Sequence, residues 1–229
     1  MSVRCDRDLL GHFGSFISKS KKQTIDRVLL NRTRYITVVL EDIFQPHNAS
    51  AVVRSCDCFG IQDLHIIESS NEYILNPNVT QGSSKWVDIY RYNKSGVSNT
   101  GNCLTQLEND GYVIYATTPH ESEMEIKEIQ LDSKIALLFG TELNGLSDYA
   151  LQRASKVVTI PMYGFTESFN LSVSVALCLH SLINKLHQST AEWPLNDQEK
   201  DAMRLNWYGK SVRNSDILEK AFYENREDK

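Results

Sequence analysis

The stretch KIALLFGTELNGLS, residues 134–147, contains the pattern that decides the fold of this chain. It opens with an apolar run, 135–139, that lacks the polar alternation of a strand with one face in water. Gly140 and Gly145 follow and allow tight turns, and Ser147 is a favoured residue for starting a helix. An apolar strand, a loop and a helix in this order are typical of a parallel sheet covered on both faces.

The same pattern recurs along the chain, so we predict an α/β fold built on a parallel sheet. Besides 134–139, we expect strands at 35–40, 63–67, 86–90, 112–117 and 156–160, with helices at 49–59, 99–110 and 170–186. Helical stretches without strands flank this region, at 4–31 with a break near 14–20, and at 196–207 and 214–223. Ligands of such sheets bind at the carboxyl ends of the strands.

Composition places the chain among ordered globular proteins. It has 229 residues, of which 41% are hydrophobic and 23% charged, enough for one fairly large domain or a core with appendages. The net charge of −5 argues against a general nucleic-acid binder, but the charge is unevenly distributed. Residues 1–34 carry a net +5, residues 35–184 a net −9 and residues 185–229 a net −1. A basic segment beside an acidic body indicates a polyanionic partner.

Cysteine usage and hydropathy point to the cytoplasm. The five cysteines are odd in number and lack metal or redox spacing, so we expect free thiols in a reducing compartment. The N-terminus has no apolar segment typical of a signal peptide. The uncharged stretch 168–183 is short for a membrane span and contains polar side chains, which favours a buried helix. We expect no membrane association.

The sequence lacks the motifs of the common nucleotide-binding and metal-dependent proteins. No G-x-G-x-x-G follows the first expected strand, and no Walker A motif is present. No set of His, Asp and Glu has ligand spacing, so we expect no metal, which argues against a metal-dependent or nucleotide hydrolase.

Three polar clusters follow expected strands. The first contains Asn48 and Arg54, which could reach the sheet edge, or could cap a helix and form a salt bridge. The second places Glu142 between two glycines, a pattern that many strand-to-helix loops share. The third runs from Ile160 to a Ser/Asn-rich helix start with Ser168 and Asn170, which could wall a purine ring or simply cap the helix.

In this order the clusters resemble the three motifs of the SpoU (TrmH-type) branch of the SPOUT RNA methyltransferases. The first motif is an Asn, five residues and an Arg, matched by Asn48 and Arg54. The second and third are matched by Gly140, Glu142, Gly145, Leu146 and Ser147, and by Ile160, Pro161, Met162, Ser168, Asn170, Ser172, Val173 and Ser174. Phe169 stands where close relatives usually have Leu, and Leu143-Asn144 replaces smaller or charged residues.

The resemblance implies a fold and a cofactor. It predicts a SPOUT domain at 35–187 with a C-terminal trefoil knot, a basic helical extension at 1–34 that serves as an RNA-binding arm, and a helical extension at 188–229. The knot loops would bind S-adenosylmethionine in a homodimer. The matching cofactor positions are Thr117, Gly140, Ile160, Met162, Phe169 and Leu171.

The resemblance also implies methyl transfer to a ribose 2′-oxygen of RNA. Arg54 would activate the hydroxyl, and Asn48, Glu142, Ser168 and Asn170 would position the reacting groups. The short terminal extensions favour tRNA, at a D-loop guanosine, over the alternatives of rRNA or another tRNA position such as the anticodon loop. Arg32, Arg34 and His47 are the expected RNA contacts. A non-catalytic RNA-binding or assembly factor is the alternative of another class.

Overall fold

The computed structural model describes residues 6–119 and 123–227. They form two compact units, one of residues 33–193 and one that combines residues up to 32 with those from 194 onward. The two terminal extensions, expected as separate segments, therefore belong to one unit. In it, α1 (Arg7–Ser15) and α2 (Lys19–Leu29) pack against α8 (Asp197–Ser211), and α9 (Ser215–Glu227) contacts α1 and α8.

The larger unit is built on a parallel sheet, as the sequence predicts. Its seven strands lie in the order β3-β2-β1-β6-β4-β7-β5. Their bounds are β1 Ile36–Glu41, β2 Asp63–Ile67, β3 Asp88–Tyr92, β4 Tyr112–Thr117, β5 Met124–Glu125, β6 Lys134–Phe139 and β7 Lys156–Thr159. All pairs are parallel, and β1 runs beside β6 with Leu40 opposite Phe139. The trefoil knot stays a prediction.

Two local expectations are wrong. The third strand begins at Asp88 rather than at residue 86, because a 3₁₀ turn, Ser83–Lys85, ends at Trp86. The segment 69–85, for which no helix was predicted, contains the short helix α4 (Pro77–Thr80), and the two-residue strand β5 was not predicted either.

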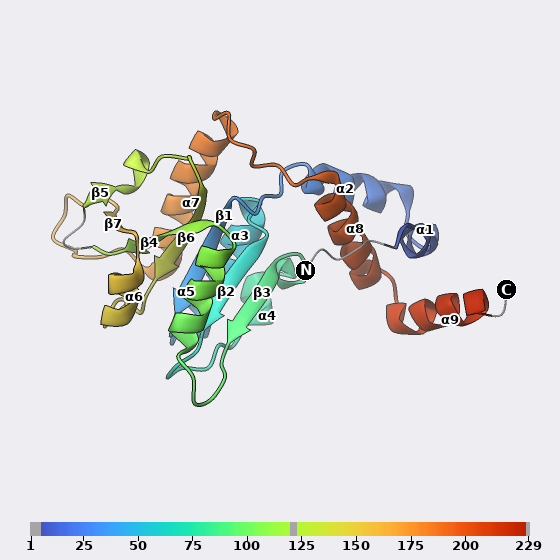
Figure 1. The fold of residues 1–229 in the computed structure, drawn as a ribbon, viewed down its shortest axis with the longest axis horizontal. Helices are drawn as coiled ribbons and strands as arrows, with labels where there is room; N and C mark the ends of the chain where they lie inside the picture. Colours follow the sequence, from blue (N-terminus) through green and yellow to red (C-terminus); the bar gives the residue numbers. More distant parts are fainter. Residues whose placement is uncertain (1–5, 120–122, 228–229) are drawn as a thin grey trace. The chain divides into compact units, whose positions relative to one another are not determined.

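Helices cover both faces of the sheet (Figure 1). On one face α3 (Pro46–Cys58) packs against α7 (Leu171–His187), and on the other α5 (Asn99–Asn109) contacts α6 (Asp148–Arg153). Each face has its own apolar cluster, so the central strands β1 and β2 are buried on both sides. The carboxyl ends of β6, β4 and β7 come to the same edge, because these strands are parallel neighbours.

His65 is a buried histidine of the sheet. It lies on β2 with its ring stacked on Tyr90 and Tyr92, at centroid distances of 5.0 and 5.9 Å. Its Nδ1 is 3.1 Å from the Tyr92 hydroxyl. Burial lowers the pKa of His65 to about 4; the charge of Asp110 opposes this shift and the charge of Arg34 adds to it. The imidazole is therefore neutral in the folded protein at pH 7.

We expect His65 to make folding stability fall as the pH drops. The unfolded chain binds a proton at His65 near pH 6.5, whereas the folded protein binds it only near pH 4. Between these values only the unfolded state is protonated, so the group costs stability that reaches about 3 kcal/mol near pH 4. Urea unfolding of the wild type and of His65→Phe, which keeps a ring in the stack, should diverge below pH 6.5. Parallel losses of stability in the two proteins would contradict this assignment.

Candidate active site

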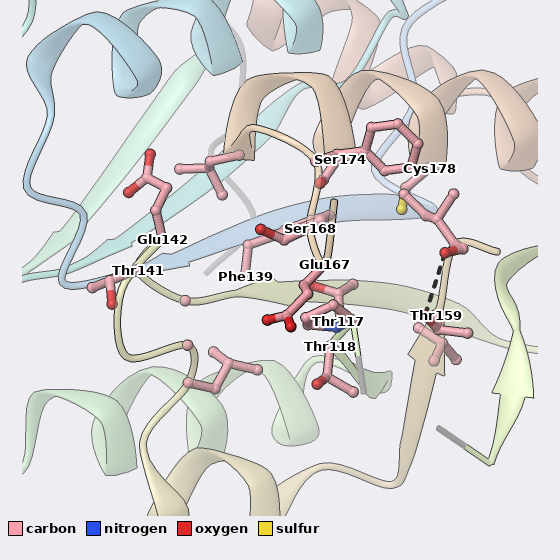
Figure 2. Close-up of a pocket in the computed structure, with 18 of the residues that line it drawn as sticks. Thr117, Thr118, Phe139, Thr141, Glu142, Thr159, Glu167, Ser168, Ser174 and Cys178 are labelled. Atoms are coloured by element: carbon pink, nitrogen blue, oxygen red, sulfur yellow. Dashed lines mark hydrogen bonds between the residues drawn. The ribbon is translucent and has the colours of Figure 1, made fainter. Parts of the chain in front are cut away.

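A cavity of about 410 Å³ opens at the carboxyl ends of β4, β6 and β7 (Figure 2). The loops that follow these strands form its wall. All six positions that the resemblance assigns to the cofactor line it: Thr117, Gly140, Ile160, Met162, Phe169 and Leu171. Glu142 and Ser168 line it as well. Residues from three distant parts of the sequence thus meet at the sheet edge where α/β folds bind ligands.

The cofactor loop, residues 140–147, forms one side of this cavity. Thr141 and Gly145 exchange two backbone hydrogen bonds of 3.0 Å, and the Asn144 N–H donates to Thr141 Oγ1 at 3.0 Å. Gly145 has a left-handed backbone, with φ of 67°. A Cβ on Gly140 would come closer than 3.0 Å to the backbone of Gly145 and Leu146. The loop is therefore a closed turn that depends on glycine at its first position.

Three of the predicted catalytic residues meet in one hydrogen-bond network. Asn48 is buried, and its Nδ2 donates to Glu142 Oε1 and, at 3.0 Å, to Gln45 Oε1. Asn170 Nδ2 donates to Asn48 Oδ1 at 3.1 Å. Asn170 also caps α7, because its Oδ1 accepts from the Ser172 N–H at 3.0 Å and from Ser172 Oγ at 2.7 Å. The network links α3, the cofactor loop and the start of α7.

Two residues of this site, Gln45 and Glu167, were not predicted from the sequence. Gln45 orients the Asn48 amide, and its only signal was its place before Pro46. Glu167 lines the cavity, and Figure 2 shows its side chain among the drawn residues at the centre of the site. The lining residues that the structure describes include two carboxylates, Glu142 and Glu167, and no Lys, Arg or His. This wall favours a ligand with positive charge.

Arg54 lies apart from the network. It is exposed on the face of α3 that also carries His47 and Cys58, whereas Asn48 is buried. Six residues turn the chain by about 240° around a helix, so Arg54 and Asn48 point in different directions. Neither Arg54 nor His47 lines the cavity. Within residues 6–119 and 123–227, no carboxylate pairs with Arg54, so the salt-bridge alternative is not seen.

The geometry does not favour the expectation that Arg32 and Arg34 contact RNA, which stays a prediction. Arg32 is 1% exposed, with its guanidinium over the Trp207 ring at 5.2 Å. Arg34 donates to both carboxylate oxygens of Asp63, at 2.5 and 2.7 Å, and to Asp88 at 3.0 Å. The Arg32 guanidinium is therefore buried, and the partly exposed Arg34 guanidinium is already paired with two carboxylates.

The described residues do not support a reactive thiol, a metal site or a membrane-spanning helix. Cys56, Cys58, Cys103 and Cys178 are free thiols. Cys178 lines the cavity, but burial raises its pKa to about 12, so it stays protonated and is a poor nucleophile. In the described part of the chain, no group of three or more His, Cys, Asp or Glu could hold a metal ion. The described helices include none long and apolar enough to cross a membrane.

Comparison with known proteins agrees with this geometry. The sequence profile of the SpoU rRNA Methylase family matches residues 35–180. A tRNA (guanosine(18)-2′-O)-methyltransferase of Borreliella burgdorferi is 42% identical over 217 residues, which cover 93% of this chain and 97% of the relative. A protein of the same name from Thermus thermophilus is 31% identical, over 71% of this chain and 81% of its own length.

A solved structure is similar over most of the chain. The Aquifex aeolicus TrmH/SpoU tRNA modifying enzyme has a TM-score of 0.75 and 28% identity, and the match covers 86% of this chain and 98% of that one. The profile match spans the whole parallel sheet and all three polar clusters. The chain therefore belongs to the SpoU rRNA methylase family.

Proposed function

We propose that this protein transfers a methyl group from S-adenosylmethionine to the ribose 2′-oxygen of a guanosine in the D loop of tRNA. The observation that carries the proposal is the network of Asn48, Glu142 and Asn170 beside a cavity lined by all six expected cofactor positions. Family membership supplies the methylase chemistry. The names of the two relatives favour tRNA and a 2′-oxygen of guanosine.

The cavity fits S-adenosylmethionine in size and in chemistry. A volume of about 410 Å³ lies in the range of small-molecule sites. Its wall offers the backbone of tight loops, four threonine hydroxyls and the carboxylates of Glu142 and Glu167, which suit the positive sulfonium. When bound, the cofactor supplies an electrophilic methyl group. Thr117, Gly140, Ile160, Met162, Phe169 and Leu171 would hold it.

Arg54 is the residue we assign to the ribose. A 2′-hydroxyl is a weak acid, so its oxygen must be made more nucleophilic as the methyl group approaches. A guanidinium keeps its proton in proteins and is therefore a poor general base. It can bind a substrate phosphate and stabilise the negative charge that develops on the oxygen. Asn48, Glu142, Ser168 and Asn170 would keep the loop and the ribose in position.

We further propose that a second copy of the chain completes the site. Arg54 lies on an exposed face of α3 and does not line the cavity of its own chain. Beside that cavity, Phe169 just before α7 and Val173 and Leu177 on its first turns form an apolar stripe, and each is at least 40% exposed. A homodimer that covers this stripe would bury apolar surface and could bring the partner's Arg54 to the cavity.

The smaller unit is the part that we propose binds tRNA, together with His47 on α3. Residues 1–32 and 194–229 hold 14 Lys and Arg against 11 Asp and Glu, whereas residues 33–193 hold 10 against 18. Exposed cations such as Lys19 and Arg27 on α2 could take the role first expected of Arg32 and Arg34. A tRNA substrate and free thiols also favour a cytoplasmic location.

Charge reversal on α2 should weaken tRNA binding in a salt-dependent way. The double variant Lys19→Glu/Arg27→Glu removes two exposed cations from the smaller unit. If both contact phosphates, the slope of log K against log salt should become shallower by about 2. Filter binding between about 50 and 300 mM salt measures that slope. Lys156→Glu, an exposed charge at the start of β7, is the control and should leave it unchanged.

Radiolabelled S-adenosylmethionine given to the protein with bulk tRNA or with rRNA tests the function directly. We expect label in tRNA, and mapping of the 2′-O-methyl group should locate it at a D-loop guanosine. A transcript in which that guanosine is adenosine should take up none. Label in rRNA alone, or at another tRNA position, would favour the alternative substrates. Absence of label in either RNA, with RNA binding retained, would favour a non-catalytic binding or assembly factor.

A further inference from the structure

Glu41, the last residue of β1, is a buried carboxylate to which the proposed chemistry gives no role. It is 4% exposed. Ser147 donates to it twice, from its N–H to Oε2 and from its Oγ to Oε1, both at 2.9 Å. Thr100 Oγ1 donates to Oε1 at 2.8 Å. A buried carboxylate is costly unless such donors satisfy it, so three hydrogen bonds on one group indicate a specific arrangement.

Two of these three bonds come from Ser147, the residue at which the cofactor loop ends. Ser147 is the N-cap of α6, where its Oγ also accepts from the Ala150 N–H at 3.2 Å. At its other end the loop leaves β6 at Gly140, beside β1. The turn between Thr141 and Gly145 is closed by its own hydrogen bonds. The loop is therefore a small rigid turn held at two points, by β6 and by Glu41.

We propose that Glu41 is a positioning residue that holds the cofactor loop in the shape that binds S-adenosylmethionine. It acts through Ser147, and it does not line the cavity itself. Through the same loop it sets the place of Glu142, and hence of Asn48 in the network. The ligand named here rests on the proposed function, whereas the link from Glu41 to the loop rests on the geometry alone.

The three bonds favour a carboxylate at this position. All three groups that bind Glu41 are donors, two of them from Ser147, whose Oγ also accepts from the Ala150 N–H. A glutamine of the same shape removes the negative charge, so the charge-assisted bonds are lost, and its –NH₂ can face the two hydroxyls only if they accept instead of donate. Glu41→Gln should therefore weaken the hold on Ser147 without creating a cavity. A hydrogen bond to a charged group corresponds to about a tenfold change in an equilibrium constant.

Thr100→Val is the matched control. Valine has nearly the shape of threonine, so the change removes the bond from α5 and leaves both bonds between Glu41 and Ser147. Both variants lose a buried hydrogen bond and should lower Tm. Only Glu41→Gln should weaken S-adenosylmethionine binding, by about tenfold in calorimetry. Only Glu41→Gln should also speed hydrogen exchange at the Thr141 and Gly145 amides.

The outcomes separate this proposal from the proposed function. A wild-type protein that does not bind S-adenosylmethionine would overturn the proposed function, while faster exchange of the loop amides in Glu41→Gln would still support the positioning role. Wild-type affinity and exchange in Glu41→Gln would overturn the positioning role. Equal losses of affinity in Glu41→Gln and Thr100→Val would also overturn it, because the effect would then be one of general stability. Ser147→Ala, which keeps only the backbone bond to Glu41, should resemble Glu41→Gln in both measurements.

Discussion

Replacing Arg54 with alanine is expected to abolish methyl transfer, by a factor of about 10³, and to leave S-adenosylmethionine affinity within about twofold of the wild type. The guanidinium is exposed on α3 and lines no part of the cavity of its own chain. Its removal therefore disturbs neither the core nor the cofactor loop. What should be lost is the positive charge that we propose acts on the ribose oxygen. Single-turnover transfer to tRNA measures the first effect, and calorimetry measures the second.

Two further variants make this result specific. Arg54→Lys keeps the charge but loses the planar fork that binds a phosphate through two donors, so it should recover only part of the rate. Cys58→Ala changes a side chain on the same exposed face of α3 and should transfer methyl groups normally. Normal turnover in Arg54→Ala would remove Arg54 from the mechanism. Loss of cofactor binding in that variant would mean that Arg54 acts on the cavity instead.

The network residues were predictable because they follow strands of one parallel sheet. Asn48, Glu142 and Asn170 are separated by up to 122 residues, yet each follows a strand at its carboxyl end. The parallel arrangement brings such positions to a common edge. The resemblance supplied which side chains matter. It could not supply Gln45, because the bond from Asn48 depends on how the first turn of α3 begins.

Arg32 and Arg34 illustrate what sequence reasoning could not reach. The segment Asn31-Arg-Thr-Arg34 has the composition of a phosphate-binding stretch. The partners of Arg34, Asp63 and Asp88, lie 29 and 54 residues away. They come close only because β2 and β3 start at the same edge of the sheet. The packing of the two chain ends into one unit could not be predicted for a similar reason, since an amphipathic helix does not specify which helix it packs against.

Gly140→Ala is expected to weaken S-adenosylmethionine binding by at least about a hundredfold. The new Cβ would overlap the backbone of Gly145 and Leu146, and no rotamer change can relieve a clash with backbone. The closed turn must open, which displaces the wall of the cavity and Glu142 with it. Gly164→Ala is the matched control, because the nearest atom to its Cβ is the Thr166 nitrogen at 4.0 Å. Its affinity should equal that of the wild type.

If Gly140→Ala fails to fold, Gly145→Ala provides a milder test. Its Cβ meets no atom within 4 Å, but the left-handed backbone strains alanine by about 1–2 kcal/mol. We expect a folded protein in which affinity falls by about tenfold. Full affinity in Gly145→Ala, together with a folded Gly140→Ala that still binds, would show that the closed turn is not part of the cofactor site.

Mixed dimers of Arg54→Ala and Gly140→Ala chains test whether Arg54 acts on the cavity of its own chain or on that of the partner chain. In a dimer of one chain of each kind, the Arg54→Ala chain has an intact cavity and its partner has an intact arginine. If the arginine serves the cavity of the other subunit, this mixed dimer contains one complete site, and co-expression should restore up to about half of the wild-type transfer per mixed dimer, as expected for one of two identical sites. If each arginine serves its own chain, both sites are defective and the mixture stays inactive. The exposed position of Arg54 on α3, outside the cavity lining, leads us to expect recovery.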